Sequence, residues 1–179
     1  MHKDGFLRIN NFTLAKVVPD STLTYTYCGT PEYMAPEILT HEGYGKSVDF
    51  WALGIFLYEC IVGISPFYGK EPMSIFKQVL NKNVKFPKGF DPTAADLIKK
   101  LLEKNPSKRL GCLKNGAKDV EAHPFFKDIE FSQISKIGDK VQLIVPPFSS
   151  SSDTQNYEEF PYNPDTSFRF ARLLICIFP

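Results

Sequence analysis

Two stretches in the first third of the chain contain residues whose types and spacing could do chemistry. The stretch INNFTLAK (9–16) opens a loop with two neutral amides, Asn10 and Asn11, where a functional loop is expected to carry a charge. Asn11 can offer one neutral carbonyl oxygen to a divalent cation, whereas such hard cations prefer charged carboxylate oxygens. The second stretch contains Glu59, a carboxylate on an otherwise apolar segment, which is costly unless it reaches a cation or the surface. Glu59 is therefore either a ligand for a cation or a surface residue at the end of a helix.

The composition limits the classes of protein to which the chain can belong. Its 179 residues, 43% of them hydrophobic, are enough to bury the core of one compact domain. With 21 basic and 20 acidic side chains the net charge is +1, so no global field attracts nucleic acid or an anionic membrane. We therefore expect no nucleic-acid partner, and partners must be sought at local patches.

Cysteine usage and hydropathy favour an intracellular protein. The chain has four cysteines that are far apart and form no CxxC pair: Cys28, Cys60, Cys112 and Cys176. With no secretory leader before them, a reducing, cytoplasmic compartment fits best. The longest apolar run, residues 48–63, is shorter than the ~20 residues that span a bilayer and contains Asp49 and Glu59. We expect a buried core helix there and no membrane span.

Helices account for most of the regular structure that the sequence predicts. Ser47 is a good N-cap and Gly63 a good helix terminator, so the run between them predicts a helix. Because this helix is apolar nearly all round, we expect it to be the central helix of the domain. A second helix is expected from Pro72, a favoured first helical residue, to Leu80. The apolar side chains that this second helix presents are Met73, Phe76 and Leu80.

The third expected helix has the clearest periodicity. Its apolar residues fall at positions i, i+3, i+4, i+7 and i+8: Ala94, Leu97, Ile98, Leu101 and Leu102. Asp91-Pro92 precedes this pattern and Asn105-Pro106 ends it. A fourth, short helix is expected around residues 119–122.

Outside these helices the pattern changes. Residues 5–16 show the alternation of a β-hairpin remnant. Residues 17–46 are rich in proline and glycine and have no sustained period, so they predict a long loop, which in a compact domain is usually functional or disordered. After Phe126 the chain becomes loop-rich, and residues 127–167 predict an extended tail lying over a surface.

Three motifs follow one another in an order that makes them specific together: CGTPEYMAPE at 28–37, DFWALG at 49–54 and KRLG at 108–111. With them the sequence closely resembles the C-terminal lobe of a protein kinase, whose APE triplet is here Ala35-Pro36-Glu37. The surrounding sequence is similar to the AGC group of serine/threonine protein kinases. Its nearest likeness is the cyclic-nucleotide-dependent branch, the cAMP- and cGMP-dependent protein kinases.

The resemblance implies a mainly α fold, a protein-kinase-like C-terminal lobe with a short N-terminal β-hairpin remnant and an extended AGC-type tail. Residues 1–126 would form a partial kinase domain from the DFG-equivalent segment onward, and residues 127–179 the C-terminal tail. The end of the tail is atypical, because residues 168–179 lack the FxxF spacing with which AGC kinases often end. A frame-shifted or misread gene end is the leading interpretation of this segment, ahead of an aggregation-prone strand or a partner-binding segment.

The family uses ATP and Mg²⁺, and the aspartate of its DFG triplet binds the metal that bridges the ATP phosphates. The resemblance aligns this triplet with Asn11, Phe12 and Thr13. An amide thus replaces the aspartate, and a β-branched side chain replaces the glycine that lets the backbone turn. These changes argue against ordinary metal-assisted phosphoryl transfer.

Other parts of a catalytic kinase are also missing from the 179 residues. They contain no GxGxxG loop, no VAIK lysine and no HRD catalytic loop. The triplet His2-Lys3-Asp4 imitates HRD, but it lies too close to Asn11 and has Ile9 where the second metal-binding asparagine should be. We therefore expect no intact catalytic residue and no metal site, and we expect neither cofactor to bind productively to this chain alone.

The remaining resemblance concerns the recognition of basic protein or peptide substrates. Three positions match the pocket for the substrate residue that follows the phosphoacceptor: Tyr27, Pro31 and Met34. Glu32 and Glu59 match acidic positions that hold substrate arginines. A regulatory subunit or domain is a further partner that the resemblance implies.

Two threonines belong to the activation loop by resemblance. Thr26 aligns with the phosphorylation site, where a phosphate adds roughly −1.5 to −2 charges and orders the loop by pairing with basic groups. The usual partner, an arginine of the catalytic loop, is missing, so we expect little switching by Thr26, and an ordinary loop threonine is the alternative. Thr30 would brace a catalytic aspartate that this chain does not contain.

Four further positions are structural in the family: Glu37, Asp49, Trp51 and Arg109. Glu37 is expected to pair with Arg109 and so to join the activation segment to the loop after the third helix. Asp49 would hold the catalytic-loop backbone in a complete kinase. Here its remaining role is that of a negative charge at a helix N-terminus. Tyr157 aligns with a tail aromatic that approaches the adenine of ATP.

Three functional hypotheses follow from these residues. The chain is a C-lobe fragment of a serine/threonine kinase that cannot phosphorylate unaided, a pseudokinase-like module that binds basic peptides without ATP, or an enzyme completed by another chain. The first is supported most strongly, because both a nucleotide lid and a metal-binding aspartate are absent. The third requires Asn11 to act as a carboxylate. Parts missing from the lobe should leave apolar surface exposed.

Overall fold

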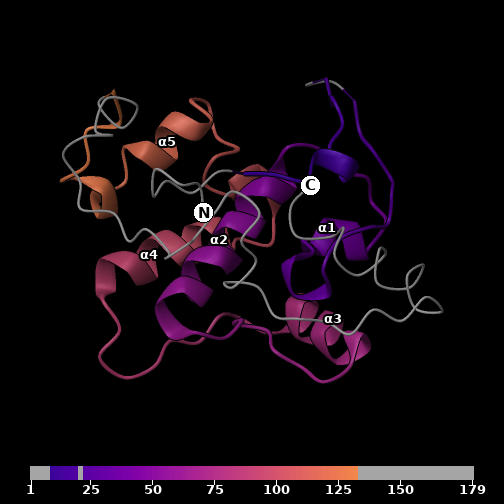
Figure 1. Cartoon of the computed structure of the whole chain (residues 1–179), viewed down its shortest axis with the longest axis horizontal. Helices are drawn as coiled ribbons and strands as arrows, with labels where there is room; N and C mark the ends of the chain where they lie inside the picture. The colour runs from indigo at the N-terminus through magenta and orange to yellow at the C-terminus, as the bar shows by residue number, and fades with distance from the viewer. Residues whose placement is uncertain (1–8, 20–21, 133–179) are drawn as a thin grey trace, which may run out of the picture.

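A computed structural model of the chain describes residues 9–19 and 22–132, and Figure 1 shows how its helices are arranged. The described part contains five α-helices: α1 (Pro36–Leu39), α2 (Ser47–Val62), α3 (Pro72–Asn81), α4 (Pro92–Leu101) and α5 (Ala117–Glu121). It also contains four short 3₁₀ turns: Phe12–Leu14, Pro31–Tyr33, Pro106–Lys108 and Pro124–Phe126. The β structure of these residues is a single antiparallel bridge between Thr24 and Tyr44. The expected mainly α fold is confirmed.

Helix α2 lies at the centre of the arrangement in Figure 1. It ends at Gly63, whose φ of 85° belongs to the left-handed region that glycine adopts without a steric penalty. Its start differs from the expectation for Ser47. Lys46 occupies the N-cap position and makes no side-chain capping bond, while the Ser47 hydroxyl donates to Glu37 Oε1 at 2.9 Å. Ser47 is therefore the first helical residue, and its side chain is bonded to α1 instead of capping α2.

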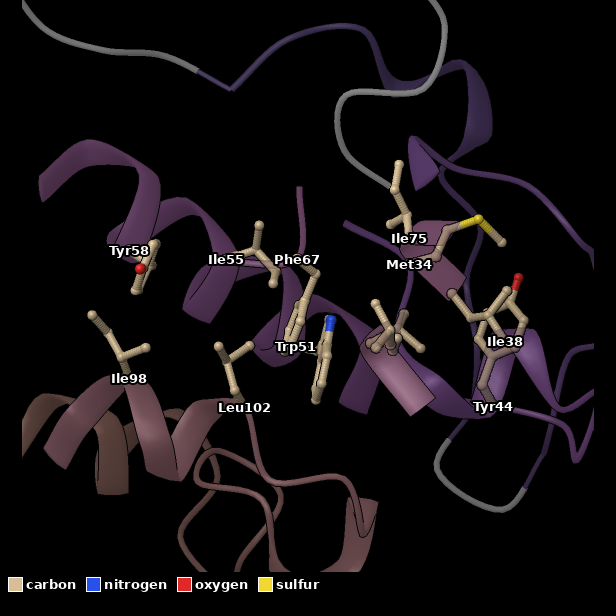
Figure 2. Packing of buried hydrophobic residues seen from close by; sticks show 13 residues of the cluster. Met34, Ile38, Tyr44, Trp51, Ile55, Tyr58, Phe67, Ile75, Ile98 and Leu102 are labelled. Atoms are coloured by element: carbon tan, nitrogen blue, oxygen red, sulfur yellow. The ribbon is translucent and has the colours of Figure 1, made fainter. Parts of the chain in front are cut away.

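A hydrophobic core surrounds α2. Figure 2 shows Ile98 and Leu102 on the α4 side of the core, facing α2. The side chains that α2 contributes to this cluster are Val48, Trp51, Ile55 and Tyr58. Residues before α2, the loop after it and α3 complete the cluster: Met34, Ala35, Ile38, Tyr44, Phe67, Ile75 and Val79. The apolar run 48–63 is thus a core helix, as its sequence predicted.

Helix α4 packs closely against α2 because Gly54 has no side chain. A Cβ at Gly54 would lie 2.8 Å from Leu102 Cδ2 and 2.9 Å from Leu101 Cβ, which is too close for any larger residue. Asp91 caps the N-terminus of α4 by accepting the Ala94 amide at 2.7 Å. The apolar positions of the third expected helix are buried, and the short fourth helix is α5, which begins two residues earlier than expected.

Helix α3 buries a different face from the expected one. Ile75 and Val79, four residues apart, are buried, whereas Met73 is 64% and Leu80 is 36% exposed. Phe76 is half-buried at the edge of the core. The helix carries apolar residues on two adjoining faces, and its contacts with α1 and the turn Pro31–Tyr33 select the Ile75 face. Periodicity within the helix could not make that selection.

The segments before α1 also differ from expectation. Residues 9–16, the described part of the expected hairpin, contain no strand. Asn11 adopts the left-handed region (φ 59°, ψ 62°) and leads into the turn Phe12–Leu14, which breaks any extended run. The expected loop 17–46 is interrupted by the turn Pro31–Tyr33 and by α1, both of which begin with proline at a favoured helical position.

Several expectations concern residues outside the described part of the chain. These are the triplet His2-Lys3-Asp4, Tyr157, Cys176, the first half of the expected hairpin and the tail from residue 133 onward. Among residues 9–19 and 22–132, no helix combines the length and the hydropathy needed to cross a membrane.

Candidate functional site

A buried ion pair fixes the segment that precedes α2. The Arg109 guanidinium donates from Nη1 to Glu37 Oε1 at 2.6 Å and from Nη2 to Glu37 Oε2 at 2.9 Å. It also donates to the carbonyl oxygens of Ser47 at 2.9 Å and Glu103 at 2.8 Å. Both side chains are buried, and two-point pairing of this kind is strong and geometrically specific. Arg109 thereby ties α1, the start of α2 and the loop after α4 into one unit.

Trp51 packs beside this ion pair. Its ring centroid lies 5.2 Å from Arg109 Cζ and 5.9 Å from the centroid of Phe67, whose ring is parallel to it within 7°. Trp51 is fully buried, and its indole N–H has no hydrogen-bond partner within the described residues. The ion pair and the aromatic stack form the rigid base on which the candidate site is built.

The carboxylate of Glu59 is held by a tyrosine from the turn Pro31–Tyr33. Tyr33 Oη donates to Glu59 Oε2 at 2.5 Å in a half-buried contact between the turn and α2. Burial, followed by the bond to Glu59, raises the pKa of Tyr33, so the hydroxyl remains a protonated donor at physiological pH. Within the described residues Glu59 Oε1 has no partner. One carboxylate oxygen is thus held by Tyr33, and the other accepts no bond from the described residues.

Glu32 extends this acidic character. It precedes Tyr33 in the same turn, and its charge also contributes to the raised pKa of Tyr33, which places the two groups close together. We call Glu32 and Glu59 the acidic patch. Tyr33, which sequence reasoning missed, follows Glu32 in the turn and is bonded to Glu59, so it connects the two residues that the sequence assigned to substrate arginines.

The extended segment 24–27 alternates two kinds of side chain on its two faces. Its backbone is bonded to Tyr44 through Thr24, with both N–H···O distances 2.9 Å, and the Tyr44 hydroxyl donates to the Thr26 carbonyl at 2.6 Å. On one face Lys16 Nζ donates to the hydroxyl oxygens of Thr24 and of Thr26, the latter at 2.8 Å. A cation therefore already contacts Thr26, which the sequence had left without a basic partner.

The other face of this segment carries Tyr25 and Tyr27. A Cβ on Gly43 would lie 2.8 Å from Tyr25 Cε1, so the Tyr25 ring rests directly on the Gly43 backbone. Tyr27 stacks on His41 and meets Phe76 edge-on. Both tyrosines thus contact the segment between α1 and α2, Tyr25 at Gly43 and Tyr27 at His41.

The three residues expected to form a pocket for the peptide differ in their exposure. Tyr27 is 47% exposed and Pro31 is half-buried, whereas Met34 is 3% exposed and belongs to the core. The Met34 side chain packs under Gly29, where an added Cβ would lie 3.2 Å from its Cγ. Met34 is therefore a core residue that contacts the neighbourhood of Gly29. Thr30 is half-buried, and its carbonyl accepts the Tyr33 amide at 2.9 Å.

The residues at the DFG-like position do not fit a magnesium site. Thr13 Oγ1 donates to Asn11 Oδ1 at 2.8 Å, so the amide oxygen that could face a metal is already an acceptor. In the described part of the chain no group of three His, Cys, Asp or Glu side chains could hold a metal ion. Asn11 and Thr13 themselves offer neutral oxygens, whereas Mg²⁺ prefers carboxylates and phosphates.

A cavity of about 550 Å³ lies between the turn Phe12–Leu14 and the start of α2. Its walls are mainly apolar, and Lys16, Cys28 and Asp49 are among the residues that line it. Asp49 is exposed at the cavity, and within the described residues its carboxylate has no partner. The surrounding protein nevertheless removes enough water to raise the pKa of Asp49.

Residues 1–126 match the model of the protein kinase domain. The chain belongs to the protein kinase family. This kinase chain is 42% identical over 161 residues to cAMP-dependent protein kinase catalytic subunit 3 of Drosophila melanogaster. The match covers 90% of the chain and 27% of the Drosophila protein. It is 39% identical over 161 residues to cAMP-dependent protein kinase type 3 of Saccharomyces cerevisiae. That match covers 90% of the chain and 40% of the yeast protein.

A human relative agrees with these two. The kinase chain is 39% identical over 163 residues to cAMP-dependent protein kinase catalytic subunit PRKX of Homo sapiens. The match covers 91% of the chain and 45% of the human protein. The likeness to AGC kinases of the cAMP-dependent type is confirmed. The chain spans less than half the length of each of these relatives.

Proposed function

We propose that this chain supplies a surface that recognises basic peptide segments, as the C-terminal lobe of a serine/threonine protein kinase, and that these 179 residues do not transfer phosphate by themselves. The acidic patch carries the first half of this proposal. Glu59 is oriented by a tyrosine that stays protonated, and its Oε1 has no partner among the described residues. An oriented carboxylate beside a second acidic residue suits an arginine side chain, which binds carboxylates through a planar fork of donors.

The second half of the proposal concerns ATP and Mg²⁺, the cofactors of the family. The hydrogen bond from Thr13 to Asn11 and the neutral character of that position support the view that neither is held productively by this chain alone. Asn11, Phe12 and Thr13 are all exposed, so no buried polar group there awaits a ligand. We infer that any phosphoryl transfer requires groups beyond these residues.

Peptide titration tests the recognition half. A peptide containing two arginines should bind with an affinity that falls as salt is added, because ions screen the attraction between exposed charges. Glu59→Gln should weaken that binding while a matched peptide with citrulline in place of arginine should bind equally poorly to both proteins. Equal binding of the arginine and citrulline peptides to the unaltered chain would contradict the proposal.

Incubation with radiolabelled ATP, Mg²⁺ and the same arginine peptide tests the catalytic half. We expect no label on the peptide above the level of a heat-denatured sample. Label that appears with the purified chain alone, and that disappears with EDTA, would overturn this half of the proposal and leave peptide recognition standing.

A pseudokinase-like binding module is the second candidate. It is favoured by the fact that the Tyr33–Glu59 bond and the Glu37–Arg109 pair are both formed between residues of the range 32–109. The fragment reading is favoured by large exposed apolar side chains near the start of the described chain: Ile9 at 73%, Phe12 at 67% and Val17 at 94%. A monodisperse, cooperatively melting monomer that binds the arginine peptide would favour the module, and aggregation during purification would favour the fragment.

Three further features belong to the same proposal. Residues 127–179 serve as the AGC-type tail, and a regulatory subunit or domain binds the lobe. The protein acts in the reducing cytoplasm, in keeping with the free thiols of Cys28, Cys60 and Cys112. Sequencing the transcript upstream of Met1 for GxGxxG, VAIK and HRD motifs would separate a piece of a longer kinase from a short protein.

A further inference from the structure

A second cavity, of about 250 Å³, lies beside the loop that follows α2. Its walls are formed by that loop, by the C-terminal half of α3 and by the segment after α3. The residues that line it are Tyr58, residues 64–68, Gln78, Lys82, Asn83 and Lys85. None of them belongs to the acidic patch or lines the cavity at the start of α2. The cavity is therefore a separate candidate site.

Two lysines give this cavity one sign of charge. Lys82 and Lys85 both line it, and no aspartate or glutamate does. Lys82 Nζ donates to Gln78 Oε1 at 3.4 Å, which leaves two of its three N–H groups without a partner in the described part of the chain. Lys85 Nζ has no partner among residues 9–19 and 22–132. A concave surface lined by cations alone concentrates anions from solution.

Ser65 adds a buried hydroxyl to the lining. The residue is 8% exposed, and its Oγ accepts the Phe67 amide at 3.4 Å. That bond uses an oxygen lone pair, so the O–H proton remains to be donated, and no described residue accepts it. The side-chain amide of Asn83 supplies two further N–H groups. Because a buried donor without an acceptor destabilises the folded state, an acceptor in the cavity would relieve that cost.

The walls that carry these donors are held in place. Gln78 Nε2 donates to the Tyr68 carbonyl at 2.8 Å and so joins α3 to the loop after α2. The Tyr58 hydroxyl donates to the Lys85 carbonyl at 2.9 Å and fixes the segment after α3 on α2. Phe86 packs next to that bond, with its ring centroid 5.8 Å from that of Tyr58. The walls are therefore positioned before a ligand arrives, which lowers the free-energy cost of binding.

We propose that this cavity binds a phosphate group, carried by a phosphomonoester or present as free phosphate. A phosphomonoester carries roughly −1.5 to −2 charges at pH 7 and three strong acceptor oxygens. Lys82 and Lys85 balance that charge, and the Ser65 hydroxyl and the Asn83 amide donate to the remaining oxygens. Lysine binds phosphate as a point charge, so the pair does not need the planar fork of an arginine. The proposal goes beyond the proposed function and does not rest on the acidic patch.

The geometry of helix α3 accounts for only one of the two lysines. Lys82 is the C-cap residue of α3, where the partial negative charge of the helix end favours a cation. Lys85 lies three residues beyond this cap, in a segment without helical structure. Lys88, three residues further along, is also exposed but does not line the cavity. The position of Lys85 is therefore the one that a ligand explains, and Lys88 is its matched control.

Phosphorus NMR measures the binding of two probes to the full chain in a phosphate-free buffer. The probes are inorganic phosphate and the peptide Gly-Ala-Ser-Ala-Gly phosphorylated on its serine, and the unphosphorylated peptide, followed by calorimetry, is the blank. Lys82→Gln and Lys85→Gln should each weaken binding of the phosphate group about tenfold, as the loss of a charge-assisted hydrogen bond does. Lys88→Gln, which removes the same charge, should change the affinity by less than about twofold.

Each outcome decides the proposal. Tighter binding of the phosphopeptide than of inorganic phosphate assigns the site to a phosphorylated protein segment, whereas equal affinities assign it to free phosphate, and both results support the site. Equal losses in Lys85→Gln and Lys88→Gln would show only a diffuse attraction for anions and would overturn the proposal. The absence of saturable binding by either probe, or equal binding of the unphosphorylated peptide, would overturn it as well.

Thermal melts show whether the variants are folded, as the exposure of Lys82, Lys85 and Lys88 leads us to expect. Should Lys85→Gln unfold, Lys82→Gln carries the same comparison with Lys88→Gln. The arginine-peptide titration of the acidic patch is a separate measurement. Loss of the phosphate site therefore leaves the proposed function standing, and loss of arginine recognition leaves the phosphate site standing.

Discussion

Tyr33 and Glu59 are joined by a hydrogen bond of 2.5 Å that connects the turn before α1 to the C-terminal half of α2. The bond spans two elements that are 26 positions apart in sequence. It orients a carboxylate that would otherwise sample several rotamers at the edge of an apolar helix. In the proposed function, peptide recognition by the acidic patch depends on a residue that carries no charge.

Removing this hydroxyl should weaken peptide binding. Tyr33→Phe keeps the ring and is expected to lower the affinity for an arginine peptide by about three- to tenfold. A hydrogen bond to a charged group is worth about 1.5–3 kcal/mol, and part of that appears as lost orientation of Glu59. Calorimetric titration measures the change. Tyr68→Phe is the matched control, since Tyr68 is 62% exposed and its hydroxyl has no bond within the described residues. Tighter binding by Tyr33→Phe would mean that the tyrosine competes with the arginine.

Loss of the buried ion pair should be severe. Arg109→Ala leaves the Glu37 carboxylate buried without its partner and is expected to lower the free energy of unfolding by about 3–5 kcal/mol. The melting temperature should then fall by about 10 °C or more. Lys100→Ala is the control, because it breaks an exposed pair with Asp96, whose side chains are 50% and 51% exposed, and should change the melt little. Equal melts for Arg109→Ala and the unaltered chain would refute a stabilising role for the pair.

Asp49 should make the protein less stable as it ionises. The protein around this exposed residue removes part of the water from its carboxyl and so raises its pKa above the ordinary 3.8, which means that the folded state holds the proton more tightly than the unfolded state. Its contribution to stability therefore falls as the pH rises from about 3.8 through the higher folded-state pKa. Asp49→Asn should raise the melting temperature at pH 7 and have little effect at pH 3, where both states are protonated. A variant that melts lower than the unaltered chain at pH 7 would show that the helix N-terminus favours the charge more strongly than burial opposes it.

A negative charge at Thr26 should be stabilised by Lys16. Lys16 Nζ already lies 2.8 Å from Thr26 Oγ1, so Thr26→Glu is expected to stabilise the fold by about 0.2–1 kcal/mol, the range for exposed ion pairs. The gain should shrink at high salt and vanish in the Lys16→Ala background. A double-mutant cycle on the two residues isolates the coupling. Thr26→Glu that stabilises equally with and without Lys16 would exclude this lysine as the partner.

The sequence predicted those helices that are determined by residues lying close together in the chain. Helix α4 has a capping aspartate before it and apolar residues at a strict helical spacing, and helix α2 has a long apolar run that ends at a glycine. Both patterns reflect contacts within a few residues. The acidic patch could be anticipated because a carboxylate in an apolar run, Glu59, is unusual in itself.

Features that depend on distant segments were not predicted. The face of α3 that is buried is chosen by α1 and the turn Pro31–Tyr33, which no periodicity within α3 encodes. The contacts of Lys16, Tyr33 and His41 join residues that are between 8 and 26 positions apart, so their side chains look unremarkable in sequence. The expected hairpin over residues 5–16 fails in its described part because Asn11 adopts a left-handed conformation that alternation does not reveal.

The burial of Trp51 gives the protein an optical reporter at its centre. The chain contains one tryptophan, and this residue lies between Arg109 and Phe67 and is fully buried. Emission excited selectively from tryptophan should therefore be blue-shifted in the native protein and should move to longer wavelength when the Arg109 loop detaches. Fluorescence from a single side chain thus follows the integrity of the lobe without any label.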